Sequence, residues 1–367
     1  MIRKARPIFC LLMLAGLLTG GLWPFNFFCK NSAVWLTQPP GLSFSAYGIA
    51  WSHQPLLLQG PGSQPGAITV ELWLQPSRYD FGDYAEILSL YRPDRSDWFT
   101  ICKARQYLFL QGRYVDADHP AGMFRLTVVD ALRRDQTDFL TVVAGPSGTY
   151  VYRNDELMRG FPGTRPSPLT LGGQLVIGNS PGGHAAWTGK ILGLAIYGRE
   201  LSWPEVARDR QRWEHGQAQG LTAQPGIAAV FPFSEGSGAA IHNLVGGKPG
   251  LEMPEWLSPP HREFLDPPTR RSFSHTRDVF LNIVGLMPFG FLVASYSHHN
   301  RRQSELRSVL WAMVAGFAVS ITIEALQVYL PSRDSSATDL INNVLGSGLG
   351  AMVWVAWMRV WARVVAG

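Results

Sequence analysis

Three apolar spans near the carboxyl end constrain the fold of this chain more than any other feature. They cover roughly residues 279–296, 309–330 and 339–361, and each is long enough to cross the hydrocarbon core of a bilayer as a helix. Their polar residues collect at one end of each span. Because successive spans run in opposite directions, the start of the first, the end of the second and the start of the third lie on one side of a membrane.

The polar residues at these ends can therefore converge. In each span they are three or four residues apart, so they share one helix face. An ionisable side chain costs about 2.5–3.5 kcal/mol at the bilayer centre on insertion scales, and a chain that keeps several at one depth is expected to use them. We predict a ligand-binding cluster made of Asp278, Asn282, Glu324, Gln327, Arg333, Asp334, Asp339 and Asn343.

Other interpretations of this cluster stay open. A hydrogen-bonded plug that only specifies helix packing would also keep buried polar groups. A membrane-embedded hydrolase or transferase could use Glu324 or Asp339 as general base, Asp334 as its partner and Arg333 as an anion clamp. No nucleophile or metal-ligand set accompanies them in the sequence, so we assign no catalytic residue. A transporter is a third class, but four spans without clear inverted repeats form a small pathway.

The amino terminus supplies the fourth span. Residues 8–28 are nearly uncharged and follow three basic residues, which is typical of either a signal peptide or a first membrane helix. No Ala-x-Ala cleavage pattern follows, and aromatic residues at positions 23, 25, 27 and 28 are typical of a membrane interface. We therefore expect a helix that stays in the membrane.

Basic residues predict the orientation of these four helices. Arg301, Arg302 and Arg307 lie between the second and third helices, and Arg359 and Arg363 lie in the last turns of the fourth. Together with the basic amino terminus they place both termini in the cytoplasm by the positive-inside rule. The expected location is the inner (plasma) membrane, multi-pass, with about 240 residues between the first two helices outside the cytoplasm.

Composition excludes some partners. Charged residues are 16% of the chain and the net charge is +5, which gives no reason to expect nucleic acid. The three cysteines form no CxxC motif, so they indicate neither a disulfide framework nor a paired metal motif. Cys29 and Cys102 could pair in an exported domain, although free cysteines are the preferred interpretation. The residues identify no cofactor.

The segment between the first two helices has a different pattern. Apolar residues at 68, 70, 72 and 74 alternate with residues at 69, 71, 73 and 75, which predicts a half-buried strand. Similar runs at 139–143, 150–153, 175–178 and 190–197 have the spacing of an antiparallel sandwich. A short helix is expected over 203–213, with Ser202 as its cap and Pro204 in its first turn.

Three phrases in this segment, AITVELWL at 67–74, TYVYRNDEL at 149–157 and WTGKILGLAIYGRELS at 187–202, resemble the laminin-G or concanavalin A-like jelly roll. The phrase FSEGSG at 233–238 resembles one that usually opens such domains, so we expect a permuted arrangement in which a late strand completes the sheet. The resemblance implies binding of a glycan or an envelope protein. Trp73, Trp187 and Trp213 are expected in the core.

Three further patterns in this segment bear on metal binding or catalysis. Asp116, Asp118 and His119 could contribute to a calcium site, although a solvated loop is the preferred interpretation of so local a cluster. A strand with paired carboxylates of the glycosidase kind is not found in the sequence. The turn signals at Gly172–Gly173 and Gly182–Gly183 are not followed by the helix that a phosphate loop requires.

The apolar spans also carry a resemblance. Residues 278–290 read DVFLNIVGLMPFG, and EALQ at 324–327, LPSRD at 330–334 and DLINNVLG at 339–346 follow. This set resembles the VanZ-like membrane family, named for an accessory protein of glycopeptide-antibiotic resistance, and LWPFNF at 22–27 resembles the end of that family's first helix. Gly346 and Gly350 belong to small-residue ridges that let two helices approach closely.

The two resemblances together imply a multidomain fold, a four-helix transmembrane VanZ-like bundle with an inserted all-β concanavalin A-like sandwich. The expected boundaries are 1–29 for the first helix, 30–270 for the extracytoplasmic sandwich and 271–367 for the other three helices. The expected function is that of a bacterial-type envelope protein that binds a membrane lipid or lipid-linked precursor, with a link to glycopeptide-antibiotic tolerance.

Overall fold

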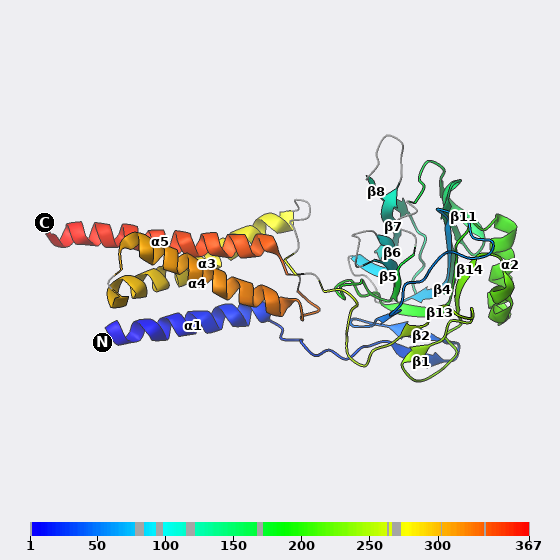
Figure 1. Ribbon diagram of the computed structural model, residues 1–367, viewed down its shortest axis with the longest axis horizontal. Coiled ribbons are helices and arrows are strands. Elements are labelled where there is room, and N and C mark those ends of the chain that lie inside the picture. Colours follow the sequence, from blue (N-terminus) through cyan, green and yellow to red (C-terminus); the bar gives the residue numbers. More distant parts are fainter. Residues whose placement is uncertain are drawn as a thin grey trace. The chain divides into compact units, whose positions relative to one another are not determined.

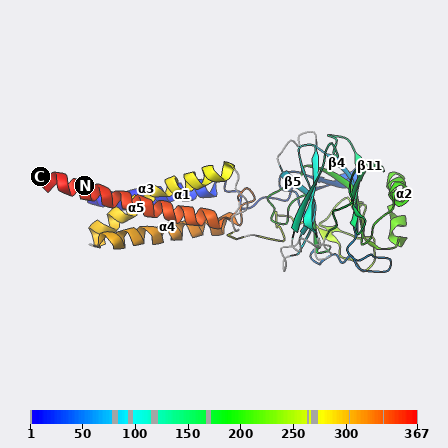
Figure 2. The ribbon, with the colours of Figure 1, turned by 90° about the horizontal axis from the view of Figure 1, so that it is seen from above.

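The computed structural model describes residues 2–77, 84–92, 98–114, 122–166, 172–262, 264–265, 273–301, 303–333 and 335–366. Within them the chain forms two compact units, one of residues 28–261 and one of residues 1–27 together with 262–367 (Figures 1 and 2). Asp116, Asp118, His119 and Asp334 lie outside the described residues, and so does the side chain of Asp278.

The unit of residues 28–261 is an antiparallel β-sandwich. One sheet has the order β1 (Val34–Thr37), β2 (Pro40–Phe44), β13 (Gly189–Tyr197), β4 (Ile68–Pro76), β9 (Asp138–Gly145), β10 (Gly148–Arg153) and β11 (Glu156–Phe161), and β14 (Ile227–Phe231) also pairs with β13. The other has the order β15 (Ala240–Ile241), β16 (Leu251–Glu252), β3 (Ala50–Trp51), β12 (Gln174–Ile177), β5 (Tyr84–Tyr91), β6 (Trp98–Ala104), β7 (Tyr107–Tyr114) and β8 (Gly122–Val128).

The late strands complete both sheets of the sandwich. β14 pairs with β13 in the first sheet, and β16 pairs with β3 in the second. Phe233, which begins the phrase that was expected to lie late in a permuted fold, is fully buried between them and stacks on Phe231. The prediction that a late strand completes the sheet is therefore confirmed; the permutation stays a prediction.

The alternation in β4 places its apolar residues in the main core, where Ile68 and Leu72 are fully buried. The prediction of a half-buried strand was wrong for its other face, because Thr69 and Glu71 are fully buried as well. Helix α2 (Trp203–Glu214) and the short 3-10 helix η1 (Ala218–Ala223) cover that face with a second apolar cluster. Figures 1 and 2 show α2 on the outer side of this sheet.

The tryptophans expected in the core are largely there. Trp187 is fully buried between the sheets, and Trp213, a residue of α2, is buried in the second apolar cluster. Trp73 is half-buried and packs against the α2 cluster. No disulfide joins the three cysteines, all of which lie in the described residues, and burial raises the pKa of Cys102 to about 12.

The second unit is helical. Its helices are α1 (Ile2–Leu22), α3 (Phe273–Arg301), α4 (Glu305–Gln327) and α5 (Ala337–Ala366), which lie side by side in both views (Figures 1 and 2). Three stretches are long and apolar enough to cross a membrane, Val279–His299, Glu305–Gln327 and Ala337–Val365.

The amino-terminal helix is shorter than the sequence suggested. Its apolar part is Ile8–Leu22, below the length of the other three, and the helix ends six residues before the predicted end at Phe28. The reason is Pro24, because a proline disfavours helical backbone at the residue before it and lacks an amide hydrogen to continue the ladder. The span expected over 8–28 is thus corrected to a helix that ends at Leu22.

Glycines hold α3 and α5 together. A side-chain carbon added at Gly346 would overlap the carbonyl oxygen of Ile283, and one added at Gly350 would overlap that of Met287. At these levels the two backbones are in direct contact, which only a residue without a Cβ allows. The packing role predicted for Gly346 and Gly350 is confirmed.

Candidate functional site

The centre of the predicted cluster is Glu324, in the last turn of α4 and only 1% exposed. Its Oε2 accepts a hydrogen bond of 2.7 Å from the backbone amide of Ser336, immediately before α5. The Ser335 hydroxyl also hydrogen-bonds this carboxylate. The first amide groups of a helix have no partner within the helix and carry partial positive charge, so the start of α5 stabilises an anion here.

A second pair joins α3 to α5. The Nδ2 of Asn282 donates to Oδ1 of Asp339 at 2.7 Å. The Ser336 hydroxyl accepts from the backbone amide of Asp339 at 3.4 Å. Asp339 and Glu324 are therefore held at the same helix terminus, on either side of Ser336.

A third pair lies one turn deeper, between α4 and α5. The Nδ2 of Asn343 donates to the hydroxyl of Ser320 at 2.9 Å, and both residues are buried. One turn deeper still, the Ser347 hydroxyl donates to the carbonyl of Ala312 at 2.7 Å. Polar contacts thus continue from the cluster into the apolar part of the bundle.

Gln327 and Arg333 bind the amino-terminal segment. The Nε2 of Gln327 donates to the carbonyl of Gly21 at 2.8 Å, and the Nε of Arg333 donates to that of Trp23 at 3.2 Å. Arg333 was predicted as a member of the cluster, as a partner for a carboxylate or for a headgroup phosphate. In the described part of the chain its hydrogen bond goes to backbone instead, because the loop after α4 runs beside the residues that follow α1.

Three amide atoms in this region have no hydrogen-bond partner among the described residues, although they are buried. They are Oε1 of Gln327, Nδ2 of Asn342 and Oδ1 of Asn343. Asn342 is one of the polar residues that open the third span, but the predicted binding cluster did not include it. Sequence analysis also missed Ser320, Ser335 and Ser336, since serines in and beside membrane helices carry no specific signal.

The cluster offers acceptors and donors but no metal site in the described residues, where no group of three His, Cys, Asp or Glu side chains converges. It combines two carboxylates at a helix start with amide groups that retain hydrogen-bonding capacity. Such an arrangement suits a polar group with several hydroxyl or amine functions.

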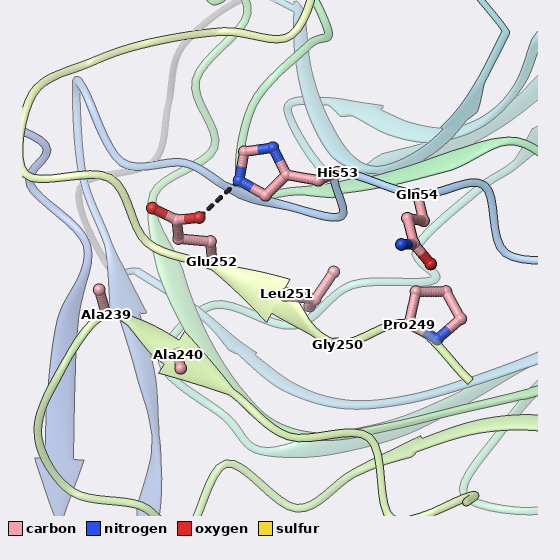
Figure 3. Close-up of a pocket in the computed structure, with 8 residues that line it drawn as sticks. All are labelled: His53, Gln54, Ala239, Ala240, Pro249, Gly250, Leu251 and Glu252. Atoms are coloured by element: carbon pink, nitrogen blue, oxygen red, sulfur yellow. Dashed lines mark hydrogen bonds and ion pairs between the residues drawn. The ribbon is translucent and has the colours of Figure 1, made fainter. Parts of the chain in front are cut away.

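The sandwich has a hollow of its own, with a volume of about 390 Å³. It is lined by side chains from β15, β16 and the segment after β3: His53, Gln54, Ala239, Ala240, Pro249, Gly250, Leu251 and Glu252 (Figure 3). The Nε2 of His53 and the Oε2 of Glu252 are 2.5 Å apart across its rim. Neither residue was singled out by sequence analysis, since they are 199 positions apart and belong to no motif.

Comparison with protein families assigns both units. Residues 240–359 match the VanZ/LLP1 family, and residues 53–207 match the concanavalin A-like lectin/glucanases superfamily. The chain thus carries a VanZ-like domain and a concanavalin A-like domain. The VanZ match begins in β15 of the sandwich and does not include α1. With its three apolar helices, the chain is a membrane-associated protein.

Several solved structures are similar to the chain. A proposed carbohydrate binding protein from Bacteroides ovatus ATCC 8483 has 13% identity and a TM-score of 0.39, over 57% of this chain and 56% of that one. A SAP-like pentraxin from Limulus polyphemus has 15% identity and a TM-score of 0.29, over 44% and 82%. The ligand binding domain of botulinum neurotoxin serotype D, in complex with N-acetylneuraminic acid, has 12% identity and a TM-score of 0.29, over 41% and 37%.

The chain spans little more than half of the Bacteroides protein and just over a third of the neurotoxin domain. No curated protein sequence matches it.

Proposed function

We propose that this protein is a multi-pass envelope protein of the inner membrane that binds a lipid headgroup or a lipid-linked precursor at the cluster around Glu324. The concanavalin A-like domain, which would be inserted between α1 and α3, would bind a glycan outside the cytoplasm. In this proposal α1 is a fourth membrane helix. A role in glycopeptide-antibiotic tolerance would follow if the headgroup belongs to a cell-wall precursor.

The unpartnered amide atoms carry this proposal. A plug that serves only helix packing gains nothing from a buried polar atom without a partner, because each such atom costs about 1–3 kcal/mol. Three of them, on Gln327, Asn342 and Asn343, lie in the same region as the buried carboxylate of Glu324. A polar ligand that hydrogen-bonds these atoms would remove that penalty, and the low dielectric of the site would strengthen each bond.

The charges favour a headgroup as the ligand. Glu324 and Asp339 would accept from hydroxyl or amine groups, whereas the exposed guanidinium of Arg333 could contact a phosphate. Arg262 adds a second cation on the same loops, since it donates to the carbonyl of Val328 at 3.1 Å and lies 4.8 Å from the ring centre of Tyr329. Carboxylates at the start of α5 together with guanidinium groups in the adjoining loops would suit a zwitterionic or phosphate-linked headgroup.

Lipid that co-purifies with the full-length protein tests the proposal. Mass spectrometry of lipid retained in detergent should show a species enriched with the native chain and lost from Glu324→Gln, while both proteins insert and unfold at the same temperature. Glu305→Gln is a matched control, because it makes the same change at the other end of α4, where Glu305 pairs with Arg359 at 2.5 Å. If Glu324→Gln loses folded protein in step with lipid, the cluster is a packing plug.

The proposed orientation has a separate test. Basic residues at the amino terminus and in α5 support the proposal that both termini lie in the cytoplasm and the sandwich lies outside. Reporter fusions after residue 200 and after residue 366 should therefore give opposite signals. A cytoplasmic signal from the fusion within the sandwich would contradict this topology, and a mature protein that begins after Leu22 would show α1 to be a cleaved signal.

A further inference from the structure

The hollow between β15, β16 and the segment after β3 has the build of a ligand site. It is concave, and its volume of about 390 Å³ lies within the range of about 300–1,000 Å³ that is usual for small-molecule sites. Figure 3 shows Glu252 turned toward His53 on one side of Leu251, with Gln54 and Pro249 on the other. Leu251 is 4% exposed and anchors this apolar floor in the sandwich core.

Strand pairing fixes the polar side of the hollow. The register of β16 and β3 sets Glu252 opposite Trp51, and His53 follows two residues later. The rings of Trp51 and His53 have centres 4.3 Å apart. The imidazole is thus held between an aromatic face and the carboxylate, which fixes the direction in which Glu252 presents its second oxygen.

The hydrogen-bonding capacity of the hollow is largely unused. Oε2 of Glu252 binds His53, but its Oε1 has no partner among the described residues. The amide of Gln54 has none there either, although the side chain is exposed at the rim. A carboxylate oxygen accepts and an amide both donates and accepts, so together they suit neighbouring hydroxyl groups.

The charge of the hollow selects among hydroxyl-bearing ligands. Among the described residues, neither lysine nor arginine lines it. The nearest basic residue in sequence, Lys248, directs its ammonium group to the carbonyls of Leu57 and Gln59, at 3.4 and 3.3 Å. A sulfated, phosphorylated or sialylated sugar would meet a carboxylate without a compensating cation, which is unfavourable. A neutral sugar meets no such penalty.

We propose that this hollow binds a neutral glycan, with Glu252 and Gln54 bonding adjacent hydroxyl groups and Leu251 and Pro249 contacting the apolar face of a sugar ring. His53 is a positioning residue that orients Glu252. The inference rests on the proposed glycan binding of the sandwich and names its site and ligand class. The concave shape of the hollow favours a small ligand such as a sugar over a protein partner.

The alternative is that His53 and Glu252 form a surface pair without function. Such a pair is worth about 0–1 kcal/mol and its loss would change little else. The two readings differ in one measurable way, because only a site loses binding when the fold stays intact. Gln54→Ala is the cleanest probe, since the native amide contributes no hydrogen bond to the described fold.

The experiment uses the full-length protein in nanodiscs on an array of neutral and acidic glycans, followed by titration of the best neutral glycan. Glu252→Ala and Gln54→Ala should each lower its affinity at least tenfold, with thermal stability and lipid retention unchanged. His242→Ala is the matched control, because His242 also faces a glutamate, Glu235 at 3.4 Å, but lies outside the hollow.

The possible results of this experiment test the position of the site, the class of its ligand and the proposed glycan binding of the sandwich separately. Glycan binding that survives both substitutions would overturn the site and leave glycan binding by the sandwich intact. Preference for acidic glycans would overturn the ligand class. If the native protein binds no glycan at all, both this site and the sandwich half of the proposed function are wrong, whereas the lipid experiment is unaffected.

Discussion

Each unit of the molecule buries one glutamate almost completely, and the two are enclosed in different ways. Glu71 is fully buried in the sandwich beneath α2, where the Trp213 ring nitrogen donates to it at 3.3 Å. Asp209 of α2 neighbours it, bonded to the Tyr197 hydroxyl at 2.8 Å and to Arg212 at 2.9 Å. Glu324 instead accepts from backbone at the start of α5, near amides without partners.

The difference shows that burial of a carboxylate does not by itself mark a functional site. At Glu71 one carboxyl oxygen accepts from Trp213 of α2 and the other, Oε1, has no partner among the described residues, while burial followed by the charge of Asp209 raises the pKa of Glu71 well above its ordinary value. This carboxyl group is enclosed between the sheet and the apolar cluster under α2. Around Glu324, hydrogen-bonding capacity is left over in the apolar interior of a bundle, and a ligand can use it.

If the polar cluster of the helical unit serves to bind a ligand, other contacts must hold its helices together. Gly350→Ala should therefore destabilise the helical unit strongly, by about 3 kcal/mol or more, because the added carbon overlaps the Met287 carbonyl and a rigid backbone must move. Thermal unfolding in detergent measures the effect. Gly285→Ala in α3, where no atom lies within 4 Å of the new carbon, is the control. Equal stability of the two variants would contradict this packing account.

A pH titration of stability sharpens the contrast from the sandwich side. At a pH well below 4.5, the ordinary pKa of glutamate, Glu71 is protonated in both the folded and the unfolded chain. As the pH rises above it, the unfolded chain loses the proton first, so stability falls by up to about 1.4 kcal/mol per pH unit until the raised folded pKa is passed. Asp209, whose pKa burial also raises, changes stability in the same direction.

Glu71→Gln should remove its share of this fall, so that the variant loses less stability than the native protein between about pH 5 and neutrality. Denaturant unfolding followed by tryptophan fluorescence would show it. Glu214 is an exposed glutamate at the end of α2, and Glu214→Gln should leave the pH profile unchanged. If the stability of native protein and of Glu71→Gln changes in parallel with pH, the pKa of Glu71 is not raised in the folded protein. The contrast between Glu71 and Glu324 would then be wrong.

The smallest expected effect concerns the start of α2, which covers Glu71. The Glu205 carboxylate accepts from the amide and hydroxyl of Ser202 at 2.8 and 2.7 Å, and it pairs with Arg199 at 2.8 Å. Burial alone would raise the Glu205 pKa, but the bonds from Arg199 and Ser202 outweigh it and lower the pKa to about 2. Ser202→Ala should cost about 0.5–1 kcal/mol.

Ionised Glu205 contributes to the free energy of unfolding above its ordinary pKa of 4.5, and this contribution is lost as the pH falls toward about 2. Ser202→Ala should consequently destabilise most at neutral pH and least in acid. Thermal melts at pH 7 and pH 3 measure the difference. A Ser202→Ala effect that grows in acid would show that the hydroxyl, and not the ionised Glu205, caps the helix.

Patterns within single segments of the sequence were enough to predict several helices, strands and packing contacts of this protein. Alternation over Ile68 to Leu74 identified a strand, the capping pattern at Ser202 placed α2, and the small residues Gly346 and Gly350 identified a close helix contact. Each of these rests on a pattern within one segment, because side-chain periodicity reports which face of an element is covered. The polar ends of the three long spans were visible for the same reason.

The contacts between these elements could be established from the tertiary structure alone. It buried Glu71 under α2, gave Arg333 to the Trp23 carbonyl, and brought His53 against Glu252 across 199 positions of sequence. These outcomes depend on strand register and on the course of loops, which no local pattern encodes. Periodicity could show that β4 has a covered apolar face, but it could not show that a distant helix closes the other one.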